Sequence, residues 1–318
     1  MMIFNLEEIK KVEQHMPILI TKLENGYVKF TKGETNVPPV GYLQFDKPVG
    51  NTFIKYGHVN GDDSFVIKIF NGFPENSELG LPTSDGMNIV FDANTGMTKA
   101  ILLDNGWLTG FRTAAATLIA AKYLAPKKIT KFGILGTGTQ AHAILDATLK
   151  FHKDLEVVVY GYTKELIDSF VAEYAKKGVK IAPAYDVSTL CEQANYIVSC
   201  TNTTEPLIYG DMVKPGSLVI GMGADTVGKN EIDASLYAKA DMIVCDYIDQ
   251  CEEVGDTRTA LEKGAVKKSD LIELGNLILE GKTRENDEQI CVVDLTGIAV
   301  QDIVVAEMVC DVLTGTIK

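Results

Sequence analysis

A glycine-rich turn directly after an apolar run places the strongest constraint on the fold of this chain. Residues 131–135 have the composition of a buried strand, and a helical pattern begins in the next six residues, Gly136-Thr137-Gly138-Thr139-Gln140-Ala141. In such a turn the first glycine permits a tight bend, the second lets the backbone approach a pyrophosphate, and the small third residue packs helix against strand. The helix N-terminus adds N–H donors and a positive dipole. The sequence therefore predicts a dinucleotide site, with all six residues binding the cofactor.

The segments on either side of this turn differ in pattern. From 131 to 245, strand-like and helical segments alternate, which predicts a parallel sheet covered by helices on both faces. From 37 to 108, strand-like segments follow one another without helices, which predicts a separate antiparallel or mixed sheet. A chain of 318 residues is expected to form two domains. We therefore expect the α/β class, with a Rossmann-type doubly wound parallel-sheet domain and an α+β domain.

Hydrophobic periodicity and turn residues give approximate bounds for the elements. Strands are predicted at 52–59, 64–70, 87–92, 98–103, 131–135, 156–160, 179–182, 196–200, 218–222, 242–245 and 290–294. Helices are predicted after Asn5, from Pro17 to about 33, at 112–125, from the glycine turn to 149, and at 164–177, 187–193, 232–239, 271–280 and 298–313.

Charge and hydropathy exclude several kinds of partner. The formal net charge is -13, from 43 acidic and 30 basic side chains, which argues against binding to nucleic acid or an anionic membrane through a general positive surface. No run reaches the ~18 apolar residues that a membrane span requires. The N-terminus shows no secretion-signal pattern. We therefore expect no nucleic-acid or membrane partner.

The cysteines and histidines indicate a reducing compartment and no metal. The six cysteines include no Cys-x-x-Cys pair and stand mostly in apolar runs, as small fillers do in cytoplasmic proteins. There are four histidines and no His-Glu-x-x-His segment, so a protein-bound catalytic metal is not expected. These features predict a cytoplasmic protein without a metal site.

The second strand of the nucleotide domain bears on the choice between NAD and NADP. An acidic residue that binds the ribose 2′-hydroxyl usually ends this strand, but here Tyr162, Thr163 and Lys164 follow it. Their hydroxyl and ammonium groups could receive a 2′-phosphate, which favours NADP(H) over NAD(H). A solvated lysine at the start of a helix explains Lys164 equally well.

By these motifs the sequence resembles the ornithine cyclodeaminase/mu-crystallin family over nearly the whole chain. Besides the glycine turn, the matching segments are Lys68 with 71–74, then 80–83, 92–96, 108–115, 223–225 with 228–231, and 294–297 with 300–302. Their order and spacing together are far more specific than any single motif. The resemblance implies a homodimer in which residues 1–125 and 296–318 form a substrate-binding and dimerisation domain. Residues 126–295 would form an inserted Rossmann domain.

The resemblance also implies an enzyme that transfers a hydride between nicotinamide and the α-carbon of an amino or imino acid. Lys68 and Arg112 would bind the substrate carboxylate, and convergent cations suit that group. Asp225 would lie near the reacting amine, where a carboxylate can act as base or stabilise an iminium. Asp225 and Lys68 are therefore the expected catalytic residues. Thr113 would lie near the pyrophosphate and Thr296 near the nicotinamide, and Thr201 is also assigned to the cofactor site.

Three positions depart from the family pattern. Residues 37–45 contain no arginine to bind the carboxylate, and the next strand offers Lys55 in place of an acid for a second amine. Val227 replaces a usual proline. Lys55 adds a cation to the substrate site but cannot attract the δ-amine of ornithine. The expected substrate is therefore a different amino or imino acid, with an anionic or small neutral side chain.

Three functional classes remain open from the sequence. The first is an imino-acid reductase or amino-acid dehydrogenase with net turnover of the cofactor. The second is a cyclodeaminase lyase that converts ornithine into proline and ammonia and regenerates its cofactor in each cycle. The third is a non-catalytic protein that binds nucleotide or ligand. The presence of Lys68, Arg112 and Asp225 favours an enzyme over the third class.

Overall fold

The computed structural model describes residues 1–317. Residue 318, the last residue of the segment 296–318 that was assigned to the substrate-binding domain, lies outside the described residues. The chain separates into two compact units. Unit 1 contains Met1–Ala115 and the segment that begins at Ile298, and unit 2 contains Ala116–Gly297.

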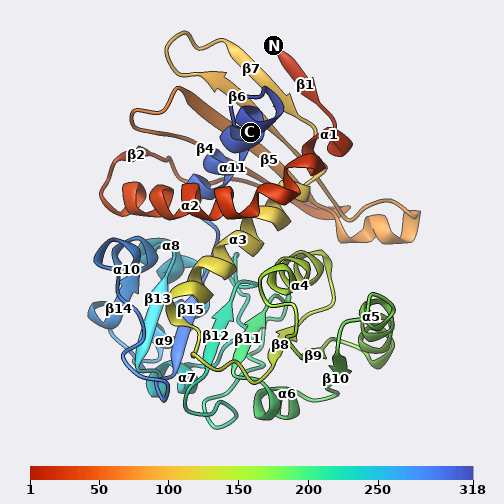
Figure 1. The fold of residues 1–318 in the computed structure, drawn as a ribbon, viewed down its shortest axis with the longest axis vertical. Helices are drawn as coiled ribbons and strands as arrows, with labels where there is room; N and C mark the ends of the chain where they lie inside the picture. Colours follow the sequence, from red (N-terminus) through yellow and green to blue (C-terminus); the bar gives the residue numbers. More distant parts are fainter. Residues whose placement is uncertain (318) are drawn as a thin grey trace. The chain divides into compact units, whose positions relative to one another are not determined.

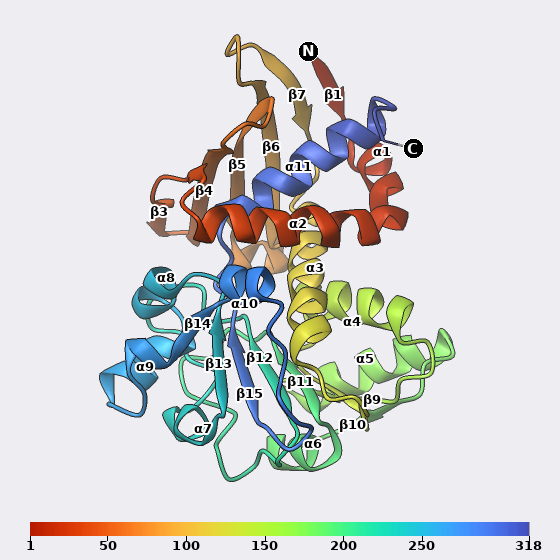
Figure 2. The same ribbon diagram turned by 60° about the vertical axis from the view of Figure 1, so that its left-hand side comes forward.

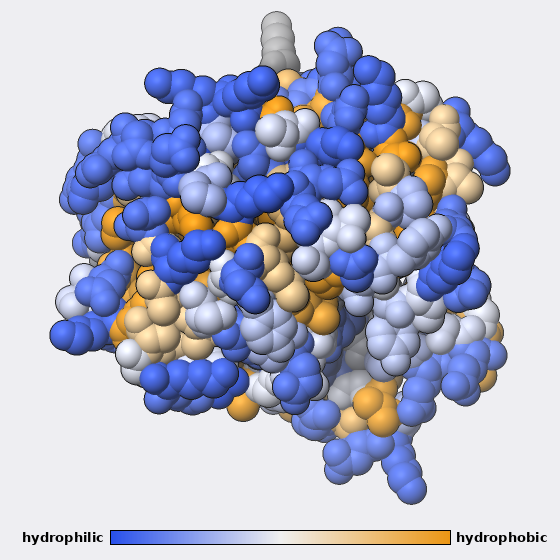
Figure 3. Space-filling view, turned by 90° about the horizontal axis from the view of Figure 1, so that it is seen from below, coloured by the Kyte–Doolittle hydropathy of each residue, from blue (hydrophilic) through white to orange (hydrophobic). Residues whose placement is uncertain are grey.

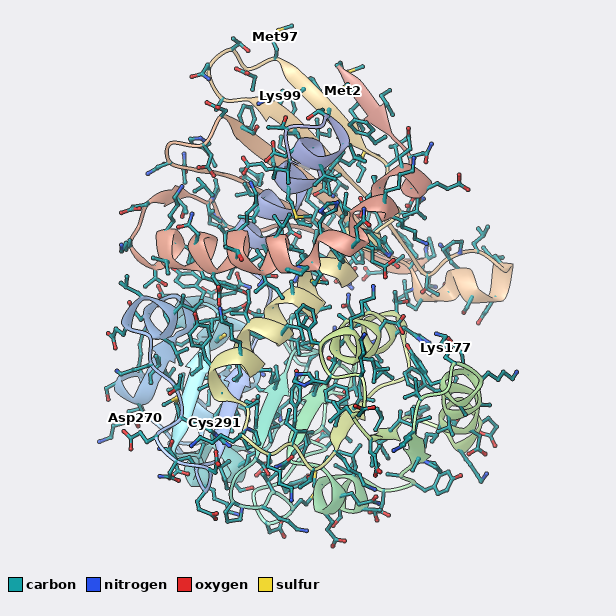
Figure 4. The ribbon with its side chains drawn as sticks, in the orientation of Figure 1. Met2, Met97, Lys99, Lys177, Asp270 and Cys291 are labelled. Carbon is teal, nitrogen blue, oxygen red and sulfur yellow. The ribbon has the colours of Figure 1, made fainter. Side chains whose placement is uncertain are left out.

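Unit 1 is built on a seven-stranded sheet in the order β1-β7-β6-β5-β4-β2, with β3 also paired to β4. The strands are β1 (Met2–Phe4), β2 (Thr35–Asn36), β3 (Gly41–Asp46), β4 (Val49–Val59), β5 (Ser64–Gly72), β6 (Ser84–Asp92) and β7 (Thr98–Leu102). Strand β1 runs parallel to β7, on which Figure 4 labels Lys99, and the other pairs are antiparallel. The prediction of successive antiparallel strands is confirmed, whereas β1, β2 and β3 were not predicted.

Helices cover one face of this sheet. They are α1 (Leu6–Lys10), the 3-10 helix η1 (Lys11–His15), α2 (Met16–Thr31) and α11 (Ala299–Leu313). The capping box predicted at Asn5 is present, because its side chain accepts from Glu8 N–H while Glu8 accepts from Asn5 N–H. Helices α2 and α11 contact each other, and α11 contacts β4, β5 and β6 (Figures 1 and 2). The face under them is therefore the buried core of unit 1.

The opposite face of the same sheet is apolar but partly exposed. Strand alternation places Ile67 and Ile89 on this face, where they are directly paired and half-buried. The rings of Phe65 and Phe91 stack at 4.7 Å between centroids. Met87 on β6 remains 37% exposed. A continuous apolar sheet face of this kind is typical of an interaction surface.

Unit 2 contains an eight-stranded, wholly parallel sheet in the order β10-β9-β8-β11-β12-β15-β13-β14. Its strands are β8 (Phe132–Leu135), β9 (Val157–Tyr160), β10 (Ile181–Pro183), β11 (Tyr196–Ser199), β12 (Leu218–Gly221), β13 (Met242–Cys245), β14 (Leu271–Glu273) and β15 (Cys291–Asp294). Its helices are α4 (Thr139–Phe151), α5 (Lys164–Lys176), α6 (Val187–Gln193), α7 (Ala234–Lys239), α8 (Ile248–Glu253), α9 (Asp256–Glu262), η3 (Lys268–Asp270) and α10 (Leu274–Glu280). Helices α4, α5 and α6 pack against the sheet (Figure 2). The predicted α/β class with a Rossmann-type sheet is confirmed.

Several predicted boundaries were wrong for physical reasons. Helix α3 (Trp107–Leu124) begins five residues before the predicted start at 112, because a buried Asp104 carboxylate accepts a hydrogen bond from Leu108 N–H in its first turn. Residues 271–273 were predicted as helix, but they pair with β13 as strand β14, so tertiary pairing overrides local propensity. The short helices α8 and α9, and the 3-10 helix η2 (Pro74–Leu79) in unit 1, were not predicted.

Hydrophilic residues predominate on the face that Figure 3 presents, and hydrophobic residues there form small separate patches. In the described part of the chain, no helix is long and apolar enough to cross a membrane. The same residues contain no group of three or more metal-ligating side chains placed to hold an ion.

Candidate functional site

The glycine turn of unit 2 has the geometry of an anion-binding turn. Gly136 adopts a φ of +119°, and a Cβ there would lie 2.9 Å from the carbonyl oxygen of Cys200, so only glycine fits. Apart from its chain neighbours, a Cβ on Gly138 would meet no atom of the described residues within 4 Å. The absence of a side chain at Gly138 therefore leaves space for a ligand to approach the backbone. Ala141 is fully buried, as a small helix-packing residue should be.

The start of α4 offers donors to a negatively charged group. Gly138 is its N-cap and makes no side-chain capping hydrogen bond, so the first-turn N–H groups, from Thr139 to Ala141, are available to a ligand. Thr137 lies against the next loop, because a Cβ on Gly161 would be 2.8 Å from its methyl group. These features fit the pyrophosphate of a dinucleotide at Gly136–Ala141.

A charged cluster lies at the start of α5, just after β9, and the sequence only partly indicated it. Tyr162 is 94% exposed, and Thr163 caps α5 by accepting from Leu166 N–H. The Lys164 ammonium lies 2.5 Å from Asp168, whose other oxygen accepts from the Tyr185 hydroxyl at 2.7 Å. The hydrogen bond with Asp168 raises the pKa of Lys164. Asp168 and Tyr185 were missed because they stand one helical turn later and in a separate loop.

A buried glutamate holds two of the loops at the carboxyl ends of the strands. One oxygen of Glu231 accepts from Ser199 Oγ at 2.5 Å and from the N–H and hydroxyl of Thr201 at 2.6 and 2.7 Å. The other oxygen accepts from Met222 N–H at 3.2 Å and Gly223 N–H at 2.5 Å. Glu231 thereby fixes Thr201 and the segment that leads to Asp225. The sequence placed Glu231 in a matching motif but gave it no role.

Asp225 lies just beyond β12, at the end of the sheet where open α/β proteins bind ligands. Its carboxylate is 44% exposed and is 2.7 Å from the Lys229 ammonium, which also donates to Asn202 Oδ1 at 3.2 Å. The Asp225 carboxylate is therefore held in place by the Lys229 ammonium and remains accessible to a second positively charged group.

Thr296 follows β15 and is held by two residues that the sequence did not single out. Its hydroxyl donates to Asp246 at 2.9 Å and accepts from the Gln250 amide at 2.9 Å. Gly297 N–H donates to the other oxygen of Asp246 at 2.7 Å. Burial raises the pKa of Asp246, against the effect of these hydrogen bonds. The loop after β15 is thus fixed by a buried carboxyl group.

Unit 1 brings two predicted substrate residues together around a buried carboxylate. Oδ1 of Asp302 lies 2.8 Å from Lys68 Nζ and 3.2 Å from Arg112 Nε. Arg112 also donates to Gln301 Oε1 at 2.6 Å, and the Gln301 amide donates to the Tyr27 hydroxyl at 2.7 Å. Lys68, Arg112 and Asp302 are 5%, 7% and 2% exposed. Strand β5 and helices α3 and α11 therefore meet at one ion cluster.

The electrostatics of this cluster follow from its burial. Burial lowers the pKa of Lys68 to about 8, with Arg112 and Lys55 acting in the same direction and Asp302 against them. Burial alone would raise the pKa of Asp302, but the charges of Lys68, Arg112 and Lys55 lower it to about 2. Within residues 1–317, Oδ2 of Asp302 is buried without a hydrogen-bond partner. The cluster therefore consists of an ionised carboxylate surrounded by cations.

Two other predicted residues belong to the same region of unit 1. Lys55 on β4 is directly opposite Lys68 on β5, and its charge acts on both members of the Lys68–Asp302 pair. Thr113 follows Arg112 in α3 and is buried. Asp302 and Gln301 were in a matching segment, but their sequence distance from Arg112 gave no signal that they contact it.

Comparison with known proteins agrees with these features. A model of the ornithine cyclodeaminase/mu-crystallin family matches residues 2–316. The chain is 31% identical over 312 residues to an alanine dehydrogenase from Archaeoglobus fulgidus, which covers 97% of this chain and 94% of that protein. It is 30% identical over 283 residues to a Delta(1)-pyrroline-2-carboxylate reductase from Bacillus cereus, with 88% and 86% of the two chains covered.

The fold comparison gives the same result. The structure of an archaeal alanine dehydrogenase dimer with bound NAD matches with a TM-score of 0.88 and 30% identity, covering 99% of this chain and 97% of that one. The family resemblance inferred from the motifs is thereby confirmed. Over essentially its whole length, the chain belongs to the ornithine cyclodeaminase/mu-crystallin family.

Proposed function

We propose that this chain is an NAD(P)-dependent oxidoreductase that transfers a hydride between nicotinamide and the α-carbon of an amino or imino acid. The main supporting observation is the buried cation pair of Lys68 and Arg112 around Asp302. The names of two relatives, an alanine dehydrogenase and a Delta(1)-pyrroline-2-carboxylate reductase, support an enzyme of this kind. In this proposal unit 1 binds the substrate and unit 2 binds the nucleotide.

Lys68 and Arg112 bind the substrate carboxylate. Before substrate arrives, Asp302 compensates part of their charge and fixes their positions, because an isolated buried cation is strongly unfavourable. A carboxylate can then form charge-assisted hydrogen bonds with both cations. Lys68 also has a catalytic role. It orients the substrate carboxylate, and the orientation of the carboxylate determines how the α-carbon faces the nicotinamide.

Asp225 interacts with the reacting nitrogen. When bound, reduced nicotinamide would supply the hydride that the α-carbon of an imine takes up while the nitrogen gains a proton, which would give the amine and oxidised nicotinamide. The negative charge of Asp225 stabilises the positive iminium nitrogen, and in the oxidative direction its carboxylate accepts the proton of the ammonium group.

In this proposal the pyrophosphate binds to the glycine turn, which consists of Gly136, Thr137, Gly138, Thr139, Gln140 and Ala141. Thr113 and Thr201 are proposed as further cofactor-binding residues. Thr296, fixed by Asp246 and Gln250, contacts the nicotinamide. At the adenosine end, Tyr162, Thr163 and Lys164 receive a 2′-phosphate, so NADP(H) is favoured over NAD(H). The ion pair with Asp168 limits this preference, because it already compensates part of the charge of Lys164.

The active form is a homodimer. The exposed apolar face of the unit 1 sheet supports it, as does the dimer described for the archaeal alanine dehydrogenase. The six cysteines are free thiols, which supports a cytoplasmic location that cell fractionation would test.

A spectrophotometric panel at 340 nm tests the function and the cofactor together. The purified protein is mixed with reduced nicotinamide and either a 2-oxo acid plus ammonium or a cyclic imine without ammonium. It should oxidise NADPH faster than NADH. Release of ammonia from ornithine without net change in absorbance would instead establish a cyclodeaminase. Tight nucleotide binding without turnover of any substrate would indicate a binding protein.

Replacing Asp225 by asparagine should reduce turnover by at least ~100-fold, because the charge that serves the nitrogen is lost. Nucleotide affinity should stay nearly unchanged, since the glycine turn is intact. Steady-state kinetics and fluorescence titration with NADPH measure the two quantities. The exposed Asp154→Asn is the matched control, and loss of nucleotide binding in a folded Asp225→Asn protein would contradict the assignment.

The kcat/KM for a 2-oxo acid at constant ammonium-ion concentration should fall as pH rises through about 8. Below that pH the Lys68 ammonium binds the substrate carboxylate, and above it the neutral amine does not. In Lys68→Arg this limb should disappear, because a guanidinium stays charged over the whole range. An unchanged limb in the variant would assign the ionisation to another group.

Ile67→Glu should convert the dimer into a monomer, because it places a charge on the apolar outer face of the unit 1 sheet. Size-exclusion chromatography with light scattering measures the mass, and Ile67→Val serves as the conservative control. A dimer that persists in Ile67→Glu, with native circular dichroism, would show that dimerisation uses another surface.

A further inference from the structure

Unit 1 contains a buried carboxyl group that the proposed reaction does not use. Asp104, in the loop between β7 and α3, is only 2% exposed. Its two oxygens have different partners. Oδ2 accepts a hydrogen bond from Leu108 N–H at 2.9 Å, and Oδ1 accepts one from the Asn88 amide at 3.2 Å. Asp104 therefore joins the first turn of α3 to strand β6.

Both contacts of Asp104 lead to the ion cluster. Asn88 on β6 is directly opposite Lys68 on β5. Arg112 stands four residues after Leu108, which is about one helical turn further along α3. Asp104 thus contacts the strand position next to one cation and the helix that carries the other. Its hydrogen bonds therefore help to set where Lys68 and Arg112 stand relative to each other.

The chain turns from β7 into α3 immediately after Asp104. Asn105 and Gly106 both have positive φ, of 51° and 78°. The Asn105 amide donates to Asp85 at 3.0 Å, and Trp107 N–H donates to the Asp104 backbone carbonyl at 2.9 Å. These hydrogen bonds fix the turn, so the Asp104 carboxyl group has a defined position.

The charge of Asp104 acts on Lys68. Burial raises the pKa of Asp104 to about 6, and its hydrogen bonds and the Lys68 ammonium act against this shift. The attraction between two opposite charges is mutual, so an ionised Asp104 favours the ammonium form of Lys68. Since the pKa of Lys68 is about 8, both groups are charged between about pH 6 and 8.

Lys68 is surrounded by charges on several sides. Burial is the largest influence on its pKa and favours the neutral amine, as do Arg112 on α3 and Lys55 on β4. Asp302 on α11 and Asp104 favour the ammonium form. Because the resulting pKa is about 8, a moderate change in one neighbouring charge alters how much of Lys68 is protonated at slightly alkaline pH.

We propose that Asp104 is a positioning residue for the substrate carboxylate. It keeps Lys68 in its ammonium form and holds Arg112 in place through the first turn of α3. The role is indirect, because the hydrogen bonds of Asp104 go to Asn88 and Leu108. This inference rests on the proposed role of Lys68 in binding the carboxylate, and it adds a group on which that role depends.

Asp104→Asn removes the charge with little change in shape. The amide oxygen of this variant can still accept from Leu108 N–H. The Asn88 amide can turn so that its own oxygen, which has no hydrogen-bond partner within residues 1–317, accepts from the new amide. Both structural contacts are then kept while the charge is lost. Asp104→Ser keeps a hydroxyl acceptor for the first turn of α3 and is a second uncharged variant.

The test measures the affinity for propionate by calorimetry between about pH 6.5 and 9, with NADPH at saturation. Wild type should lose affinity as pH rises through about 8, where Lys68 loses its proton. In Asp104→Asn this limb should lie about one pH unit lower, the effect of one nearby charge. At pH 8.5 propionate should therefore bind about 5- to 10-fold more weakly than to wild type. At pH 6.5 it should bind at least as tightly.

The outcomes separate this inference from the proposed function. The same displacement in Asp104→Ser, and none in the exposed Asp63→Asn, would support a local effect of the Asp104 charge. An unmoved limb in the folded variants, or an equal loss of affinity at every pH, would make Asp104 a purely structural residue and overturn the inference. Unchanged propionate affinity in Lys68→Met would instead refute the proposed carboxylate site itself. NADPH affinity should stay the same in all variants, because the glycine turn belongs to unit 2.

Discussion

The ion cluster of Asp302, Lys68 and Arg112 connects three elements of unit 1 that are far apart in the sequence. Removing charges from water is costly, and a buried pair is stable only if its geometry recovers that cost. Here one oxygen of Asp302 contacts both cations, while Gln301 accepts a hydrogen bond from Arg112 and donates one to the Tyr27 hydroxyl. Removing one partner of such a pair typically costs about 3–5 kcal/mol, because a charge is left buried without compensation. The positions of β5, α3 and α11 therefore depend on this contact.

Unit 2 uses buried carboxyl groups in a different way, to fix its backbone. Glu231 accepts hydrogen bonds from the loops after β11 and β12, and Asp246 holds the loop after β15. These loops follow neighbouring parallel strands, which end at the same edge of the sheet. Rigid loops keep reacting groups in place without further ordering when a ligand binds, which is the general requirement for efficient catalysis.

Local patterns in the sequence predicted the glycine turn, the parallel sheet and the antiparallel strands, because each depends on neighbouring residues. The start of α3 and strand β14 were missed because Asp104 and the pairing with β13 act through the tertiary structure. Lys68 and Arg112 were assigned to the substrate site from matching motifs, and Lys55 from a departure from the family pattern. Asp302 stood in a matching segment, but the sequence did not identify it as the partner of Lys68 and Arg112. It stands 190 residues from Arg112, and no periodicity links two positions so far apart.

The interruption of unit 1 by unit 2 has a consequence for the order of events during synthesis. Lys68 and Arg112 precede the interruption, whereas Gln301 and Asp302 follow it. During synthesis on the ribosome, Lys68 and Arg112 are added to the chain long before Asp302, which is their counter-ion. Unit 1 therefore cannot complete its interior until nearly the whole chain has emerged, whereas the glycine turn and the parallel sheet of unit 2 lie in one continuous stretch that is available earlier.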